Sequence, residues 1–204
     1  MNLSNSLESL FRPTVATALL TLSRLGPMSG RQVARVTGAA SASVTRTALL
    51  ELVSIGLVAA TARPHAVEYA VNEDHLLWPA VKRARDIRSE LDDEINRLAK
   101  KHAAAGTSVL LYGSTARFSS TADSDVDLLV VHPDHTTLGE RDAFSELLAG
   151  RVEAWTGNRA EIYDVTDAQL AELVGNGDPM VESWRHEAVL VAGAKPATLE
   201  RGAR

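Results

Sequence analysis

Apolar residues in the first part of the chain recur at helical spacing and then give way to alternation. Residues 14–25 are apolar at steps of three and four and stop at a Gly-Pro pair, which predicts an amphipathic helix. Ser29 and Ser41 stand where the N-caps of two further helices would be, and the second of these helices stops before Gly56. The pattern therefore predicts three consecutive helices.

Two β-like runs follow these helices. Residues 57–61 and 66–71 are joined by a short segment that contains Arg63, Pro64 and His65. Two such runs with a short connection predict a β-hairpin, here with a basic tip.

The second half of the chain alternates between predicted strands and helices. We expect strands at residues 108–112, 126–132, 159–165 and 188–191, and helices at 79–104, from 114 onward, and at 140–155, 167–174 and 180–186. This order predicts an α/β domain with a mixed sheet flanked by helices. Together with the helical first part, the whole chain is α+β.

Residues 79–104 are expected to form one long helix that connects the two parts. Along this segment the basic end precedes the acidic end, which is unfavourable for the dipole of a single helix. The apolar residues form one stripe, which we expect to pack against the second domain, with a dimer seam as the alternative. The stripe consists of Val81, Ile87, Leu91, Ile95 and Leu98.

Composition and charge set outer limits on the kind of protein. The 204 residues include no cysteine, which excludes disulfides and thiolate metal sites, and no apolar run approaches the ~20 residues of a membrane span. The first residues lack the apolar core of a signal peptide, so we expect a soluble, cytoplasmic protein. Residues 1–72 carry six Arg and no Lys against three Glu, whereas the remainder is acidic. Such asymmetry suggests two parts with different partners.

The order of helix, short helix, helix and hairpin is that of a winged helix-turn-helix. Residues 28–58 resemble that family in their small turn residues, in the Ser/Thr-rich start of the third helix and in the Gly-Leu-Val run before the hairpin. The resemblance implies a domain over residues 1–74 that binds double-stranded operator DNA through its third helix and its wing. The residues that it places toward DNA are Ser41, Ser43, Thr45, Arg46 and Thr47, with Arg63 and His65 near phosphates. A helical module that makes only protein contacts is the alternative.

Candidate chemistry gathers in one short stretch of the second half. Gly113 and Ser114 follow the predicted strand at 108–112, and after ten further positions Asp125 and Asp127 begin the next strand. Residues i and i+2 of a strand point to the same face, so the two carboxylates would lie close enough to share a divalent cation. A Gly-Ser turn can present N–H groups and a hydroxyl to phosphates. The combination indicates phosphoryl or nucleotidyl transfer.

This pattern resembles the minimal members of the nucleotidyltransferase superfamily over roughly residues 79–193. Beside the Gly-Ser pair and the Asp-Val-Asp run, Ala116, Arg117 and Ser124 match the usual motif of that family. Phe118 stands where its minimal members often have Gly, so we expect a stiffer loop here. The domain is expected to span residues 75–196, followed by a tail at 197–204.

The resemblance implies a set of site residues and a reaction. Asp125, Asp127 and a third carboxylate would hold two Mg²⁺ ions, and Glu161 fits the third position best, although many relatives have Asp there. The nucleotide would be bound by Gly113, Ser114, Arg117 and Ser124. The implied reaction is in-line attack on the α-phosphate of an NTP, with ATP expected, and release of pyrophosphate.

Several neighbouring residues have simpler interpretations. Arg117 could instead form a salt bridge to Asp123 or Asp125, and Asp123 is expected to be a solvated loop residue. His132 and His135 have a spacing that can bind a metal, but around a proline a polar turn is expected. Three tryptophans are expected in cores: Trp78, Trp155 and Trp184.

The two resemblances together predict a DNA-binding nucleotidyltransferase that transfers a nucleoside monophosphate, with AMP expected. Minimal members of that superfamily act as antitoxins that modify a partner toxin, and antitoxins often repress their own promoters, so a cognate toxin is an expected acceptor. The alternative is a nucleotide-sensing transcriptional regulator whose transferase domain is not catalytic. A tRNA 3′ end or a small alcohol would be another acceptor. By analogy with winged-helix regulators we expect a homodimer.

Overall fold

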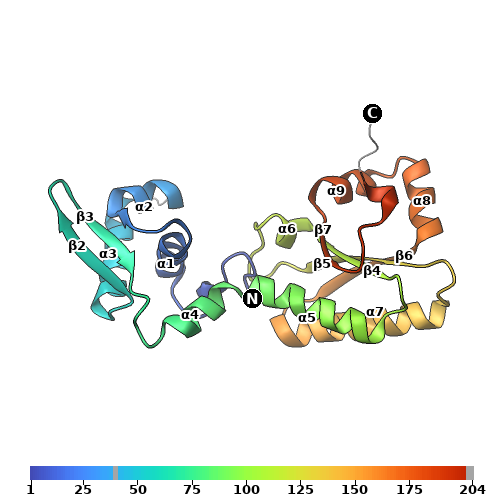
Figure 1. The fold of residues 1–204 in the computed structure, drawn as a ribbon. Coiled ribbons are helices and arrows are strands. Elements are labelled where there is room, and N and C mark those ends of the chain that lie inside the picture. The colour runs from blue at the N-terminus through green and yellow to red at the C-terminus, as the bar shows by residue number, and fades with distance from the viewer. Residues whose placement is uncertain (39–40, 201–204) are drawn as a thin grey trace. The chain divides into compact units, whose positions relative to one another are not determined.

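The structure is a computed structural model in which residues 1–38 and 41–200 are described (Figure 1). The chain divides into two compact units, one of Asn5–Ile87 and one of Met1–Ser4 with Arg88–Arg204. The division thus falls inside the predicted connecting helix rather than at residue 74. Of the predicted tail, Ala197–Leu199 forms a short 3-10 helix, η2, and residues 201–204 lie outside the described residues.

The Asn5–Ile87 unit contains the predicted helices and hairpin. Its helical elements are η1 (Ser6–Ser9), α1 (Pro13–Leu25), α2 (Gly30–Thr37), α3 (Ala42–Ser54) and α4 (Trp78–Arg85). Its strands β1 (Met28–Ser29), β2 (Val58–Arg63) and β3 (Ala66–Val71) form an antiparallel sheet in the order β1-β3-β2. The small turn residues at 39 and 40 lie outside the described residues.

Local sequence explains where these helices begin and what they bury. Ser29 caps α2 in a capping box: its hydroxyl accepts from the Gln32 N–H, while the Gln32 side chain accepts from the Ser29 N–H at 2.8 Å. The Ser41 hydroxyl caps α3 in the same way by accepting from the Val44 N–H. The helices and the sheet enclose one apolar core, whose fully buried members include Leu19, Leu22, Leu49, Leu52 and Leu57.

The predicted helix at 79–104 is two helices, α4 and α5 (Ile87–His102), separated at Asp86. Because of this break, the charge pattern that is unfavourable for one helix is favourable for two. Lys82, Arg83 and Arg85 fall in the last turn of α4, and Glu90 falls in the first turn of α5. Each helix therefore has the charges that its own dipole favours.

The stripe on this segment serves two cores instead of one. Val81 is buried in the core of the Asn5–Ile87 unit. Leu91 and Ile95 are buried residues of the helix α5, and both belong to the other unit. The prediction that the whole stripe packs against the second domain is therefore wrong for its first member.

The second unit is built on a four-stranded mixed sheet. Its strands are β4 (Ser108–Tyr112), β5 (Val126–His132), β6 (Ala160–Thr166) and β7 (Val189–Ala192), in the order β6-β5-β4-β7. β5 and β6 are parallel, whereas β4 is antiparallel to both β5 and β7. The helices are α5, α6 (Gly113–Ala116), α7 (Leu138–Thr156), α8 (Asp167–Gly175) and α9 (Pro179–Glu187).

Helices cover both faces of this sheet. On one face Leu110, Leu129 and Val165 pack with residues of α8 and α9, among them the fully buried Trp184. On the other face Asp164 bonds to side chains of α7, and Figure 1 shows α5 beside α7 on that side. The mixed α/β arrangement agrees with the predicted class. In the described part of the chain, no helix has both the length and the apolar character to cross a bilayer.

Candidate active site

Strand register brings the main candidate residues to one end of the sheet. Asp127 lies opposite Tyr112 on antiparallel β4 and beside Glu161 on parallel β6. Gly113 begins α6 directly after Tyr112, so it too lies at this end. Gly113, 14 positions before Asp127 in the sequence, and Glu161, 34 positions after it, thereby become neighbours of the Asp127 carboxylate.

Gly113 and Asp127 are in such close contact that position 113 requires glycine. The backbone of Gly113 has a φ of +69°, and a Cβ added there would lie 2.0 Å from Asp127 Oδ2. A side chain would therefore be strained in its backbone conformation and would also displace the carboxylate. The glycine of the motif places a polypeptide backbone directly against the aspartate.

Negative charge accumulates around Asp127. Burial raises the pKa of its carboxyl, and the charges of Glu161 and Asp125 raise it further, while Arg117 opposes them. Burial, followed by the charges of Asp127 and Glu161, raises the pKa of Tyr112 to about 12. A bound cation would relieve this repulsion.

The carboxylate oxygens of the cluster suit a hard cation, although the three side chains do not point to one common position. Carboxylate oxygens are the ligands that Mg²⁺ prefers. Asp125 and Asp127 are half-buried, whereas Glu161 is exposed. Over residues 1–38 and 41–200, no three His, Asp or Glu side chains form a group that could hold a metal ion as placed. The three carboxylates therefore interact through their charges but do not form a closed ligand set.

Arg117 pairs with a residue that the sequence did not indicate. Its guanidinium forms an ion pair with Glu187, the last residue of α9, rather than with Asp123 or Asp125. The Glu187 carboxylate also accepts from the Ser183 hydroxyl and lies near the Gly113 N–H. The Ser183 hydrogen bond, ahead of those from Arg117 and Gly113, lowers the pKa of Glu187 despite its burial.

The loop after α6 begins with an unusual backbone conformation. Phe118 has a φ of +56° and is exposed, at the place where the resemblance expects Gly. Its N–H lies 3.4 Å from the Thr115 carbonyl, and the Ser119 N–H donates to the Ser114 carbonyl at 2.9 Å. This is the hydrogen-bond pattern of a helix end with a left-handed residue after it, a position that glycine normally fills.

Further along, the loop is held by hydrogen bonds. The Ser124 hydroxyl accepts from the Thr121 N–H at 2.9 Å, and the Ser124 carbonyl accepts from Asn158 Nδ2 at 2.8 Å. The Ser4 N–H donates to Ser120 Oγ at 3.1 Å, and the Ser120 N–H donates back to Ser4 Oγ at 2.9 Å. Ser124 thus shapes the loop that leads to Asp125. No pattern in the sequence indicates the contact to Ser4.

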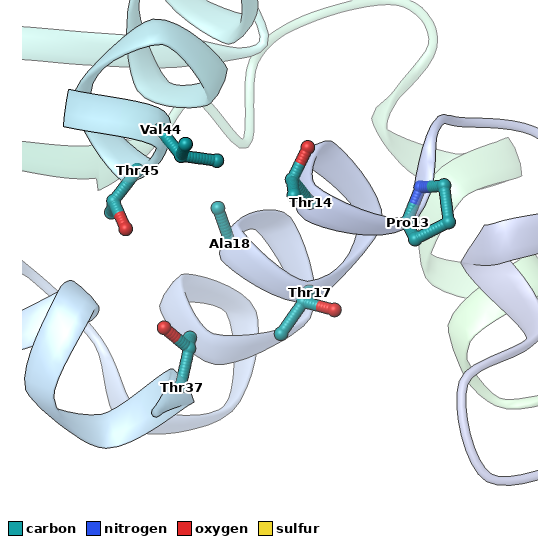
Figure 2. Close-up of a pocket in the computed structure, with 7 residues that line it drawn as sticks. All are labelled: Pro13, Thr14, Thr17, Ala18, Thr37, Val44 and Thr45. Carbon is teal, nitrogen blue, oxygen red and sulfur yellow. The ribbon is translucent and has the colours of Figure 1, made fainter. Parts of the chain in front are cut away.

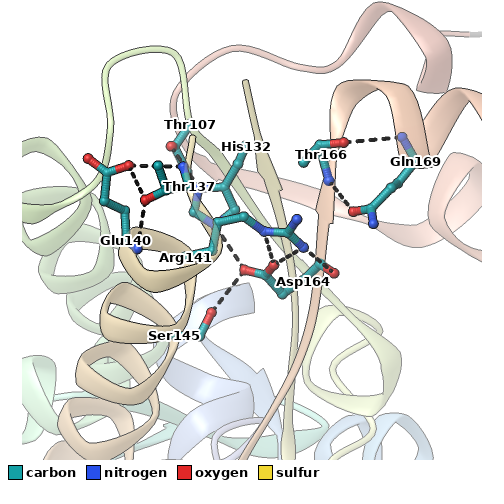
Figure 3. Close-up of polar contacts among 9 residues, drawn as sticks. All are labelled: Thr107, His132, Thr137, Glu140, Arg141, Ser145, Asp164, Thr166 and Gln169. Carbon is teal, nitrogen blue, oxygen red and sulfur yellow. Dashed lines mark hydrogen bonds and ion pairs between the residues drawn. The ribbon is translucent and has the colours of Figure 1, made fainter. Parts of the chain in front are cut away.

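On the opposite face of the sheet, a second polar cluster surrounds Asp164 (Figure 3). Asp164 accepts from Arg141 Nε at 2.6 Å and from the Ser145 hydroxyl at 3.0 Å, and it lies 2.8 Å from His132 Nε2. His132 is buried, and its Nδ1 lies 3.2 Å from the Thr107 hydroxyl. His132 therefore joins a buried network within the fold rather than the predicted polar turn.

The residues predicted to face DNA differ in exposure. Thr45 is only 5% exposed and lines a cavity of about 170 Å³ between the first three helices, together with Pro13, Thr14 and Val44 among others (Figure 2). Because α3 turns Thr45 inward, it cannot contact a groove, and this part of the prediction is corrected. The other six residues are exposed: Ser41, Ser43, Arg46, Thr47, Arg63 and His65.

Comparison with known families bears on the unit that holds the acidic cluster. Residues 89–172 match the family model of the nucleotidyltransferase domain. The match is less than half of the chain and includes β4, α6, β5 and β6, with every candidate residue of the acidic cluster and its loop. A comparison with the curated proteins found no match.

Two solved structures are similar to part of the chain. One, a toxin-antitoxin with AMP-PNP, is 14% identical over 52% of this chain and 77% of its own, with a TM-score of 0.37. The other, a toxin-antitoxin MntA-HpeT mutant, is 12% identical over 52% of this chain and 76% of its own, with a TM-score of 0.36. Similarity at this level does not bear on the activity of this chain.

Proposed function

We propose that the chain is a magnesium-dependent nucleotidyltransferase that moves a nucleoside monophosphate, expected to be AMP, from an NTP to an acceptor hydroxyl. The observation that carries the proposal is the placement of Asp127, which touches the Gly113 backbone and is the register neighbour of Glu161. A carboxylate pair next to a glycine turn is the arrangement that joins a metal site to a phosphate site. The family match at residues 89–172 supports the same assignment.

In this proposal the residues of the chain position Mg²⁺ and the phosphates, and their carboxylates supply the negative charge that binds the metal. Asp125, Asp127 and Glu161 would hold Mg²⁺, whose chemistry when bound is to neutralise the phosphates and to lower the pKa of the attacking hydroxyl. Ser114 and the Gly113 N–H would orient the β- and γ-phosphates, with Arg117 as a further phosphate ligand. Ser124 holds the loop before Asp125 through its bond to the Thr121 N–H.

The Asn5–Ile87 unit is proposed to bind double-stranded DNA as a winged helix-turn-helix. The helices α1, α2 and α3 and the hairpin of β2 and β3 have the order of that family. The last pair of the hairpin is Arg63 with Ala66, and a two-residue turn joins them. The proposed DNA-facing residues are Ser41, Ser43, Arg46 and Thr47 on α3, with Arg63 and His65 at the wing. A homodimer, operator binding and a cognate toxin as acceptor are part of the same proposal.

The activity can be tested without knowledge of the acceptor. We propose to incubate the full chain with Mg²⁺, each α-³²P-labelled NTP in turn and a cell lysate that supplies acceptors. Transfer of label to a macromolecule, strongest with ATP and abolished by EDTA, is the expected result. Nucleotide binding with neither transfer nor pyrophosphate release would instead support a nucleotide-sensing regulator. A labelled protein, tRNA or small molecule would distinguish the classes of acceptor.

A further inference from the structure

The carboxylate of Glu187 occupies the hydrogen-bond donors that a phosphate would need. It forms an ion pair with the Arg117 guanidinium and lies near the Gly113 N–H, which helps to lower its pKa. Both donors lie in the segment that follows β4, next to Asp127. A backbone N–H and an arginine that converge on one anionic group are the elements of an oxyanion site. Here that anionic group comes from the protein itself.

Glu187 holds this place in spite of an unfavourable position in its own helix. It is the last residue of α9, where the helix dipole disfavours a carboxylate. Its side chain is only 17% exposed, so the carboxylate has lost much of its hydration. The Ser183 hydroxyl, one turn earlier on α9, supplies a third donor. Glu187 therefore stays where it is because three donors meet there, as they would for a bound anion.

A triphosphate and Glu187 would compete for the same donors. Two anionic groups cannot both occupy the Gly113 N–H and Arg117 without strong repulsion. The charge of Glu187 also reaches the acidic cluster, since it is among the groups that raise the pKa of Asp127. An incoming phosphate would thus meet a carboxylate already in its place.

We propose that Glu187 is an internal phosphate mimic that the triphosphate of the NTP displaces from Gly113 and Arg117 when it binds. The inference rests on the proposed function, because it takes those two donors to be phosphate ligands. Arg117 pairs with Glu187 on α9 in the structure. With nucleotide bound, Arg117 would pair with phosphate instead. The affinity for nucleotide is then limited by the separation of this pair.

Calorimetric titration of the full chain tests the inference, with ATP and inorganic tripolyphosphate as probes in the presence of Mg²⁺. Glu187→Gln removes the competing charge and keeps the shape of the side chain, so both probes should bind about tenfold more tightly. Ser183→Ala, which weakens the hold on Glu187 but leaves the phosphate donors intact, should tighten binding by about threefold. The matched control is Glu182→Gln, which removes a charge from an exposed position of the same helix, where Glu182 pairs with Arg185. It should change the affinity by less than about twofold.

The background of Arg117→Gln separates competition from a general change of charge. Because Glu187 and the phosphate share Arg117, the gain from Glu187→Gln should shrink in that background. Weaker or unchanged binding of both probes by Glu187→Gln, with an unchanged melting temperature, would overturn the inference and make Glu187 a brace for the loop. Absence of binding in every variant would overturn it as well. If Glu187→Gln binds tripolyphosphate more tightly but the protein transfers no label from ATP, the proposed function alone is contradicted. If the wild type transfers label but Glu187→Gln has the wild-type affinity for both probes, the inference alone is contradicted.

Discussion

At the scale of single residues, the candidate site has two carboxylates in different settings: Asp127 lies against the Gly113 backbone, and Glu187 pairs with Arg117. The spacing from Gly113 to Asp125 and Asp127 predicted that a turn and two carboxylates would meet, because strand periodicity is a local property. Glu187 could not be found in this way. It follows Arg117 by 70 positions, and only the packing of α9 against the sheet brings the two together. The prediction for Thr45 differs in kind: Thr45 stands three positions before Ala48 and four before Leu49, both buried on α3, so helical periodicity itself places it on the inward face.

Gly113→Ala is expected to damage both folding and activity. The left-handed backbone and the 2.0 Å approach of an added Cβ to Asp127 Oδ2 should lower the free energy of unfolding by about 1–3 kcal/mol. Gly150→Ala is the matched control, because Gly150 lies within α7 with nothing within 4 Å of an added Cβ. The control should be neutral or should raise stability by up to about 1 kcal/mol. Urea denaturation measures both, and equal stability of the two variants would contradict the close contact.

Asp164 should make the stability of the protein depend on acid pH. Burial alone would raise the pKa of its carboxyl, but hydrogen bonds from His132 and Arg141 outweigh burial and hold the pKa below its ordinary value. Its stabilising contribution is therefore complete above the unfolded pKa of about 3.9 and is lost as pH falls through the folded pKa. Asp164→Asn should lose about 3 kcal/mol at neutral pH and should flatten the acid side of the stability profile.

Denaturant titrations between neutral and strongly acid pH provide the measurement for Asp164. Asp142→Asn, an exposed aspartate on α7, serves as the control and should leave the profile unchanged. An Asp164→Asn profile that runs parallel to the wild type would show that the polar cluster does not stabilise the fold through this charge.

At the scale of secondary structure, apolar periodicity predicted most elements but not the break at Asp86. The stripe from Val81 to Leu98 continues through the break, although Val81 is buried in the core of one unit and Leu91 and Ile95 belong to the other unit, where they are buried. The order of charged residues along this segment does indicate the break. One helix with a basic start and an acidic middle is unfavourable, whereas two helices that divide at Asp86 are each favourable. An electrostatic conflict within a predicted helix is thus a useful sign of a division.

The capping box of α7 gives a prediction at this scale. The Thr137 hydroxyl accepts from the Glu140 N–H at 3.3 Å, and Glu140 Oε2 accepts from the Thr137 N–H at 2.9 Å. Thr137→Ala should lower the free energy of unfolding by about 1 kcal/mol, because it leaves an N–H at the helix start unpaired. Thr137→Ser keeps the hydroxyl and should retain most of the stability. Thermal denaturation of the pair measures the difference, and identical melting temperatures for the Ala and Ser variants would contradict the role of the hydroxyl.

At the scale of the whole molecule, the uneven charge indicated two parts, and the structure divides the chain into two units. The boundary differs from the predicted one because α4 contributes Trp78 and Val81 to the first core, although its sequence continues the pattern of α5. The first four residues belong to the second unit, through the reciprocal bonds between Ser4 and Ser120. No periodic pattern could reveal a contact between segments 116 residues apart.

If each unit acts as proposed, a substitution in the first unit should weaken DNA binding without changing nucleotide transfer. Arg46→Ala, on the exposed face of α3, should weaken binding to operator DNA by about tenfold and lower the salt dependence, while nucleotide transfer stays unchanged. Arg97→Ala removes an exposed arginine from α5 and is the control for net charge. Fluorescence anisotropy at several salt concentrations measures the affinity. An Arg46→Ala variant that binds DNA as tightly as the control would remove α3 from the proposed interface.

The central claim is that Asp127 belongs to a metal-dependent transferase site, and the rate of label transfer from α-³²P-ATP tests it most directly. Wild type and the loop control Asp123→Asn should transfer label at similar rates in Mg²⁺. Asp127→Asn should be slower by at least about a hundredfold, while it remains folded by circular dichroism. Transfer by Asp127→Asn at the wild-type rate, or no transfer by the wild type from any NTP, would contradict the account.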